Sequence, residues 1–119
     1  MKREKSTTVE TYTKEIGKIK SIRFGFGGYQ DAMMGFSIEL GGKAWGVGDF
    51  KGTWATNSKG AKWTEEDRDK EFAKAVRFVW KLLETADKRD LNQLVNVPIE
   101  ATFDKNHTLV SWRILTEVI

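Results

Sequence analysis

The residue types in one glycine-rich segment, residues 24–31 (Phe-Gly-Phe-Gly-Gly-Tyr-Gln-Asp), could bind a phosphate-bearing ligand. Successive backbone N–H groups in such a segment can form a concave nest for an anion. Tyr29 adds a ring that could stack on a base, and Asp31 adds an acceptor for a ribose hydroxyl or a base amine. The spacing is not that of a dinucleotide-binding fingerprint, and a tight turn in which Asp31 bonds its own backbone is an equal alternative. The candidate ligand-binding residues here are Gly27, Gly28, Tyr29, Gln30 and Asp31.

Three residues outside that segment are further candidates for ligand contacts, and they are Arg23, Trp54 and Arg113. Trp54 lies in a polar segment, residues 51–63, that carries several lysines. Aromatic rings beside lysines are typical of base stacking combined with phosphate neutralisation. Arg113 follows Trp112 in an alternating segment, so it should point away from the core, where a guanidinium could bind phosphate or simply be solvated. Arg23 directly precedes the glycine-rich segment and adds a positive charge beside it.

The residue types that catalysis and metal binding require are scarce. The chain has no cysteine, which excludes disulfides, thiolate nucleophiles and zinc–thiolate sites. His107 is its only histidine, and a lone histidine in a turn is usually a surface residue. A hydrolase would need two converging acids or a metal cluster, and the sequence shows neither. We therefore expect a protein that is not an enzyme and that has no catalytic residue, metal or cofactor.

The composition favours a single small domain. The chain has 119 residues, of which 39% are hydrophobic, and no apolar run approaches the ~20 residues of a membrane span. Residues 1–13 are polar and show no signal peptide, so we expect the cytosol. The formal net charge is +3, with a basic excess in residues 1–24 that could attract a phosphate-bearing partner. The alternative is a flexible, solvated leader, residues 1–14, followed by an edge strand protected by lysines.

Alternation of apolar residues predicts three strands in the first half of the chain. Residues 16–26 form the first, in which a break in parity indicates a bulge near Lys20. Residues 34–40 form the second. Gly41-Gly42 predicts a two-residue hairpin, followed by a third strand at residues 43–50.

The second half begins with the strongest local pattern. Thr64 and Asp67 are typical of a capping box, and they predict a helix over about residues 65–86. Its apolar stripe is Phe72, Ala75, Val76, Val79, Leu82, Leu83 and Ala86. The cap pattern recurs at residues 90–93, which predicts a short helix or turn. Strands are then expected at residues 97–103 and 109–118, with Val110, Trp112 and Ile114 facing the core.

This order, β-β-β-α-β-β, predicts an α+β fold. We expect a mostly antiparallel five-stranded sheet with one long helix packed on one face. Residues 15–119 would form the single domain, and residues 1–14 the leader.

Glycines gather on one face of the predicted strands. Gly25, Gly35, Gly46 and Gly48 fall on the face opposite the apolar one. Such a strip lacks side chains, so a planar ligand or another subunit could lie on it. Together with Leu115 and Ile119 on the last strand, it favours a homo-oligomer. The alternative is that these glycines relieve crowding where a small sheet twists strongly.

Three segments carry a resemblance to a known family. They are residues 16–35 (Ile-Gly-Lys-Ile-Lys-Ser-Ile-Arg-Phe-Gly-Phe-Gly-Gly-Tyr-Gln-Asp-Ala-Met-Met-Gly), residues 45–54 (Trp-Gly-Val-Gly-Asp-Phe-Lys-Gly-Thr-Trp) and residues 111–115 (Ser-Trp-Arg-Ile-Leu). With them, residues 14–119 resemble the first type of Thoeris anti-defence protein, a family of small phage and prophage proteins.

The resemblance implies a molecular sponge. Members of that family bind cyclic ADP-ribose isomers made by bacterial TIR-domain enzymes without degrading them, and some also bind cyclic oligonucleotides. They assemble from dimers into larger homo-oligomers. The resemblance further implies action in the cytoplasm of the infected bacterial host, Arg113 on phosphate, and Asn92 and Asn96 near the ligand. Ordinary loop and cap roles are the alternative for both asparagines.

A second function class remains open. Small basic phage proteins also bind nucleic acid, or inhibit a host or defence protein by direct contact. The basic N-terminal segment supports this alternative. Charge placement separates the two, because a polyanion binder spreads lysines over one face, whereas a sponge gathers a few polar groups in a pocket.

Overall fold

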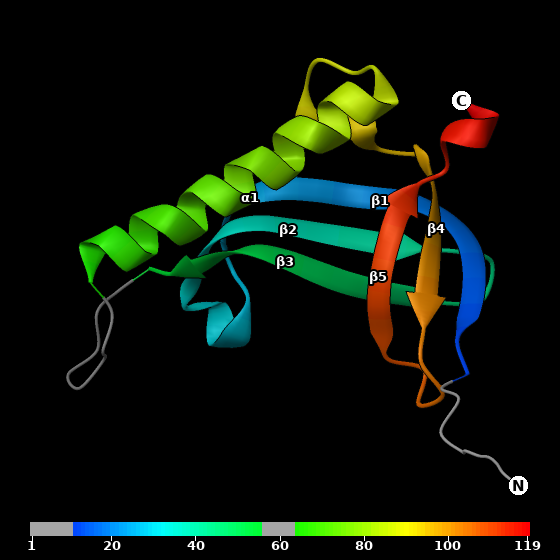
Figure 1. The fold of residues 1–119 in the computed structure, drawn as a ribbon, viewed down its shortest axis with the longest axis horizontal. Helices are drawn as coiled ribbons and strands as arrows, with labels where there is room; N and C mark the ends of the chain where they lie inside the picture. Colours follow the sequence, from blue (N-terminus) through cyan, green and yellow to red (C-terminus); the bar gives the residue numbers. More distant parts are fainter. Residues whose placement is uncertain (1–10, 56–63) are drawn as a thin grey trace, which may run out of the picture.

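A single antiparallel sheet with one long helix makes up this α+β fold, as predicted. The structure is a computed structural model that describes residues 11–55 and 64–119. Its five strands are ordered β3-β2-β1-β4-β5, and the helix α1 lies across one side of the sheet (Figure 1). The elements are β1 (Thr13–Gly27), β2 (Met33–Gly41), β3 (Gly46–Trp54), α1 (Glu65–Ala86), β4 (Pro98–Phe103) and β5 (Leu109–Ile114).

The long strand β1 is the centre of the sheet and bends it. Residues 18–27 of β1 pair with β2, and residues 13–18 pair with β4. Figure 1 shows β1 following β2 and β3 and then curving down beside β4 and β5. The predicted bulge is present, because the β1–β2 register shifts between Ile19 and Ser21, at Lys20. The bent sheet has an inner face, toward α1, and an outer face, away from it.

The position of β1 corrects two expectations. The strand begins at Thr13, so Thr13 and Lys14 belong to the sheet and not to the leader; the leader's residues 1–10 lie outside the described ranges. The strand is also central, so its lysines do not protect a sheet edge. Lysines on a central strand need another explanation.

The helix α1 spans the predicted residues because its start is strongly marked. The Thr64 Oγ1 accepts a hydrogen bond from the Asp67 N–H at 3.0 Å, and the Asp67 carboxylate accepts one from the Thr64 N–H at 3.1 Å. This capping box satisfies two backbone donors that the first turn would otherwise leave free. The stripe buries Ala75, Val79, Leu82 and Ala86, whereas Val76, predicted to join it, is exposed. The second cap pattern, at Asp90 and Gln93, begins the short 3-10 helix Leu91–Leu94, as predicted.

The core fills the inner face of the bent sheet. Its most deeply buried apolar side chains are Ile19, Ile38, Leu40, Leu94 and Ile99. The half-buried Trp112 of β5 also faces inward, as predicted, and its indole N–H donates to Asp49 Oδ2 of β3 at 2.7 Å. Since β3 and β5 are the two edge strands, this bond joins the opposite edges across the inner face.

Two connections differ from the predicted ones. The β2–β3 turn is not a two-residue hairpin: Gly41 pairs with Gly46, and four residues, 42–45, connect the strands. The Gly42 N–H donates to the Trp45 carbonyl at 3.0 Å within this turn, and the Trp45 side chain packs against the core. In consequence β3 runs from Gly46 to Trp54, later than the predicted 43–50.

The last strand is shorter than predicted. It ends at Ile114, and a 3-10 turn follows at Thr116–Val118. The buried Leu115 still donates its N–H to the Pro98 carbonyl, but Pro98 has no N–H to return, so the regular pairing stops there. Val110, expected in the core, is exposed since a register shift opposite Phe103 leaves it outside the regular pairing. Within the described ranges, no helix has the length and apolar character that crossing a bilayer requires.

Candidate functional site

The glycine-rich segment forms a tight turn. Residues Tyr29–Asp31 make a short 3-10 helix, with positive φ at Gly28 (68°), Gln30 (53°) and Asp31 (55°). The Asp31 N–H donates to the Gly28 carbonyl, and the Ala32 N–H donates to the Tyr29 carbonyl. Because the turn itself uses these donors, its geometry favours the turn interpretation over an open anion nest. Gly27, which precedes it, is buried under the side chains of Ser37 and Phe50.

Two predicted aromatic residues do meet. Tyr29 is exposed, and its ring lies edge-on to Trp54, the last residue of β3, with 6.2 Å between centroids. The lysine nearest to Trp54 in the described sequence, Lys51, points to the inner face, where its ammonium lies 4.7 Å from the centre of the Phe78 ring. Among the described residues, the pair is therefore an aromatic corner without Lys51 beside it, and the other lysines of the predicted segment, Lys59 and Lys62, lie outside the described ranges.

A strip of glycines is present, but only half of the predicted one. Gly25 and Gly35 pair side by side across β1 and β2, and Gly52 of β3 continues the row. Gly46 and Gly48, which were predicted to join it, pair instead with Gly41 and Glu39 further along β3. A Cβ on Gly35 would meet the backbone of Lys51 and Gly52, so β2 and β3 approach too closely there for a side chain. The guanidinium of Arg23 lies over Gly25, where a Cβ would be 3.3 Å from its Nη1. The alternative that these glycines relieve crowding thus accounts for the centre of the strip.

Arg113 points outward, as alternation predicts, but two carboxylates hold it. Its Nη2 lies 2.8 Å from Glu117 Oε2, and its Nε lies 3.1 Å from Glu100 Oε1. Arg113 donates hydrogen bonds to Glu117 and Glu100, and these bonds raise the pKa of Arg113 above its ordinary value. In return, the bond from Arg113 lowers the pKa of Glu117 to about 2. A phosphate would have to displace at least one carboxylate to reach this guanidinium.

The two predicted asparagines, Asn92 and Asn96, differ in their structural setting. Asn92 is an exposed residue of the 3-10 helix at 91–94. Asn96 has a positive φ of 75°, and its N–H donates to the Ile19 carbonyl at 2.7 Å, beside the β1 bulge. This contact places Asn96 at a groove on the outer face, where the bend of β1 meets the β2–β3 turn.

The outer groove is a basic concavity. Its volume is about 520 Å³, and it has three lysines and no acid among its lining residues, which are Ile16, Gly17, Lys18, Lys20, Gly41, Gly42, Lys43, Asn96 and Pro98. We call it the lysine groove. None of its three lysines forms an ion pair with another residue of the described ranges, 11–55 and 64–119. Their charges are thus available to an anion.

The bulge explains why two of these lysines lie together. Ile19 points inward and Lys20 is the extra residue of the bulge, so Lys18 and Lys20 both reach the outer face. A Cβ on Gly41 would come within 3.1 Å of the Lys20 Cγ, which shows that this side chain lies directly over bare backbone. Lys43 adds the third charge from the four-residue turn. A ligand could approach this floor closely because glycine presents no side chain.

Sequence reasoning found Asn96 but missed the lysines of this groove. The available signal was the pair Lys18 and Lys20 on either side of a parity break, together with Lys43 in a glycine turn. Among the described residues, no group of three His, Asp or Glu side chains could hold a metal ion.

In comparisons with known proteins, no protein-family model, no curated protein and no solved structure matches the chain.

Proposed function

We propose that this protein binds a small phosphate-bearing nucleotide in the lysine groove and holds it without chemical change. The observation that carries the proposal is the set of three unpaired lysines around a glycine floor. Lysine ammonium groups attract phosphate strongly when no carboxylate competes for them. Asn96 lies at the same groove and adds amide donors and an acceptor for ribose or base.

The resemblance to the Thoeris anti-defence family narrows the ligand. We propose that the nucleotide is a cyclic signal, such as a cyclic ADP-ribose isomer or a cyclic oligonucleotide, and that the protein sequesters it in the cytoplasm of an infected bacterial host. A sponge needs cations, donors and stacking surfaces, and it needs no general base. In this proposal Arg113 is a secondary contact, because Glu100 and Glu117 must first release it.

Calorimetry with a matched pair of variants tests the proposal. A panel of cyclic ADP-ribose isomers and cyclic dinucleotides is titrated into the protein, and each bound ligand is recovered after heating. Replacing Lys18 and Lys43 by Gln should weaken binding by about tenfold or more, since each exposed charge contact contributes about 1 kcal/mol. The control is Lys81→Gln, because Lys81 is an exposed lysine of α1 far from the groove lining. Equal affinity in both variants, or ligand consumed beyond one equivalent per site, would exclude this function.

Direct binding of nucleic acid is the second candidate. It is favoured by the position of the groove on an outer face that also carries Lys14 on β1. A polymer would contact more phosphates than the groove holds, so its affinity would fall much more steeply with salt than that of a small nucleotide. Titration of single-stranded DNA at two salt concentrations distinguishes the two.

We also propose a homo-oligomer, supported by a surface different from the one the sequence suggested. Phe24 and Phe26 on the inner face of β1, and Val76 and Trp80 on α1, are each more than half exposed. α1 lies mainly over β3, so it leaves this part of β1 uncovered. The three aromatic side chains among them together expose roughly 400 Å², which is close to the apolar area that one partner contributes to a standard protein–protein interface. Trp80→Asp should shift the protein toward the 13.6 kDa monomer in light scattering, whereas Val110→Asp, at an exposed site on β5, should not.

A further inference from the structure

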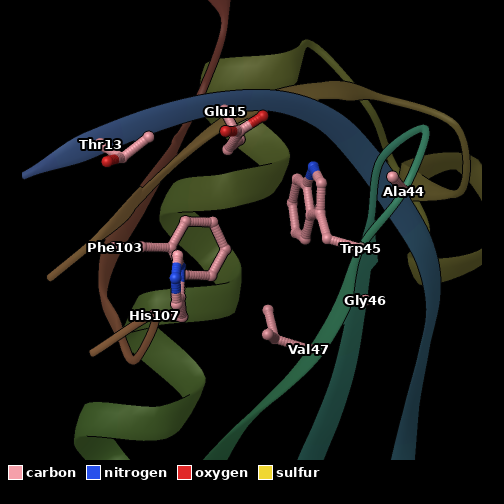
Figure 2. A pocket seen from close by; sticks show the side chains of 8 residues that line it. All are labelled: Thr13, Glu15, Ala44, Trp45, Gly46, Val47, Phe103 and His107. Carbon is pink, nitrogen blue, oxygen red and sulfur yellow. The ribbon is translucent and has the colours of Figure 1, made fainter. Parts of the chain in front are cut away.

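A second concavity opens on the inner face of the sheet, behind the lysine groove. Its volume is about 370 Å³, within the usual range for small-molecule sites. Figure 2 shows Trp45 and Val47 on one side of it, Phe103 and His107 on the other, and Thr13 and Glu15 on β1. We call it the aromatic pocket.

The main wall of the aromatic pocket is held in place by close packing. A Cβ on Gly17 or on Gly42 would collide with the Trp45 indole, so these two glycines allow the ring to lie against bare backbone. The ring of Phe103 meets the indole edge-on, with 5.3 Å between centroids and an interplanar angle of 79°. The indole is thus fixed on two sides, and only its pocket side is open. A rigid aromatic wall of this kind is a low-entropy surface for stacking.

The polar groups of the pocket differ from those of the groove. Glu15 lies on the inner face of β1 and forms no ion pair with any described residue. Among the described residues that line the pocket there is no lysine or arginine. His107 is held at φ 63° by a turn in which Asp104 Oδ1 accepts from the Asn106 and Thr108 N–H groups. A neutral imidazole offers one donor and one acceptor, whereas the Glu15 carboxylate only accepts.

We propose that the aromatic pocket binds a planar heteroaromatic molecule of purine size that carries an amine and no phosphate. The ring stacks on the Trp45 indole, the amine donates to the Glu15 carboxylate, and a ring nitrogen pairs with His107. Phosphate is disfavoured, because the single charge of the lining is negative. This site is separate from the lysine groove, and the proposal does not rest on the proposed function.

Fluorescence titration with 2-aminopurine riboside tests this site, because stacking on an indole quenches the probe. Two matched probes accompany it: purine riboside, which lacks the amine, followed by NMR of the Trp45 indole N–H, and the 5′-phosphate of 2-aminopurine riboside. We expect 2-aminopurine riboside to bind at least about threefold more tightly than either matched probe. Purine riboside lacks the amine that donates to the charged Glu15, and the 5′-phosphate is repelled by the same negative charge. Glu15→Gln should remove the discrimination against the 5′-phosphate, and it should reduce the preference for the amine, because the Gln carbonyl still accepts a hydrogen bond but carries no charge. Glu15 is exposed, so the substitution should leave the fold intact.

The outcomes separate this site from the lysine groove. Lys18→Gln with Lys43→Gln should leave binding of 2-aminopurine riboside unchanged, and a nucleotide held in the groove should not displace it. Absence of quenching and of any Trp45 indole shift at millimolar riboside would overturn the proposal. Preference for the 5′-phosphate, or loss of riboside binding in the lysine variant, would equally overturn it by assigning the ligand to the groove.

Discussion

The lysine groove and the aromatic pocket are built from the same two segments of the chain and have opposite chemistry. Both use the turn at residues 42–45 and neighbouring parts of β1, but they share no lining residue. Lys18 and Lys43 belong to the groove, whereas Glu15 and Trp45 belong to the pocket. Alternation along one strand therefore places a cationic surface and an aromatic, acidic one back to back, about one sheet thickness apart. A small protein can in this way offer sites of opposite charge without a second domain.

Removal of the pocket wall should have the largest effect on stability. Trp45 is half-buried and packs on Phe103, so Trp45→Ala should lower the free energy of unfolding by about 2–3 kcal/mol, somewhat less than for a fully buried ring. Urea denaturation followed by circular dichroism measures this. The control, Val110→Ala, truncates a side chain that is 52% exposed and should change stability by less than about 0.5 kcal/mol. Equal losses in the two variants would mean that Trp45 is not part of the core.

A methyl group on the turn should separate the two sites. The Cβ of Gly42→Ala would collide with the Trp45 indole, so the variant should lose about 1–2 kcal/mol of stability and most binding of 2-aminopurine riboside. Phosphate binding in the groove should persist, because the three lysines are retained. At Gly46 the nearest heavy atom to an added Cβ is 3.7 Å away, so Gly46→Ala is the matched control and should leave both sites intact. Loss of groove binding in Gly42→Ala would show that the sites are coupled.

Salt should act on one site only. Raising NaCl from about 50 to 500 mM should weaken a phosphate-bearing ligand of the groove by about fivefold, because exposed charges are screened over about 3–10 Å. Binding of 2-aminopurine riboside should change by less than about 1.5-fold, because stacking on Trp45 is not a charge interaction. Both affinities come from calorimetry on the same preparation. Parallel salt dependence would contradict the assignment of opposite chemistry.

The smallest expected effect is the pH dependence of the ion pair between Arg113 and Glu117 on the outer face. The hydrogen bond from Arg113 stabilises the charged form of Glu117 and lowers the pKa of this carboxyl from its ordinary 4.5 to about 2. The folded pKa is depressed, so the ion pair stabilises the protein above pH 4.5 and this contribution is lost as the pH falls toward 2. NMR titration of the Glu117 carboxyl carbon should show this midpoint, and Arg113→Gln should return it toward 4.5. If Arg113→Gln weakens phosphate binding as much as the Lys18 and Lys43 variant does, Arg113 belongs to the site after all.

Local signals predicted most of the elements, and non-local contacts decided the rest. The capping box at Thr64 fixed the start of α1, and the parity break at Lys20 located the bulge, because both are read within a few residues. The four-residue turn at 42–45 was missed because Gly41-Gly42 was the local signal for a turn, and the packing of Trp45 against Gly17 and Phe103 is not visible in the sequence. The early end of β5 was missed because it lies opposite Pro98 of β4, which has no N–H to return to Leu115.

The candidate site was harder to predict than the fold. Alternation correctly predicted that Arg113 points outward. Its partner Glu117 could not be predicted in the same way, because it lies in a 3-10 turn where the sequence pattern predicted a continuing strand. One of the two interpretations of the basic N-terminal segment placed Lys18 and Lys20 on an edge strand, because the sequence does not reveal that β4 pairs with β1 on the side opposite β2. Strand order is set by pairing between distant segments, and it was this order that decided which side chains share a face.

The central position of β1 also affects how the chain is made. On a ribosome β1 is synthesised early, and β2 follows within a few residues and can pair with it at once. The other partner, β4, begins at Pro98, so residues 13–18 of β1 have no β4 to pair with until residues 98–103 have been translated. An open strand edge is a template for pairing with other strands, so this interval is when the nascent chain is most exposed to mispairing. The bond between Trp112 and Asp49, which are 63 residues apart, can form only after β5 has also been made.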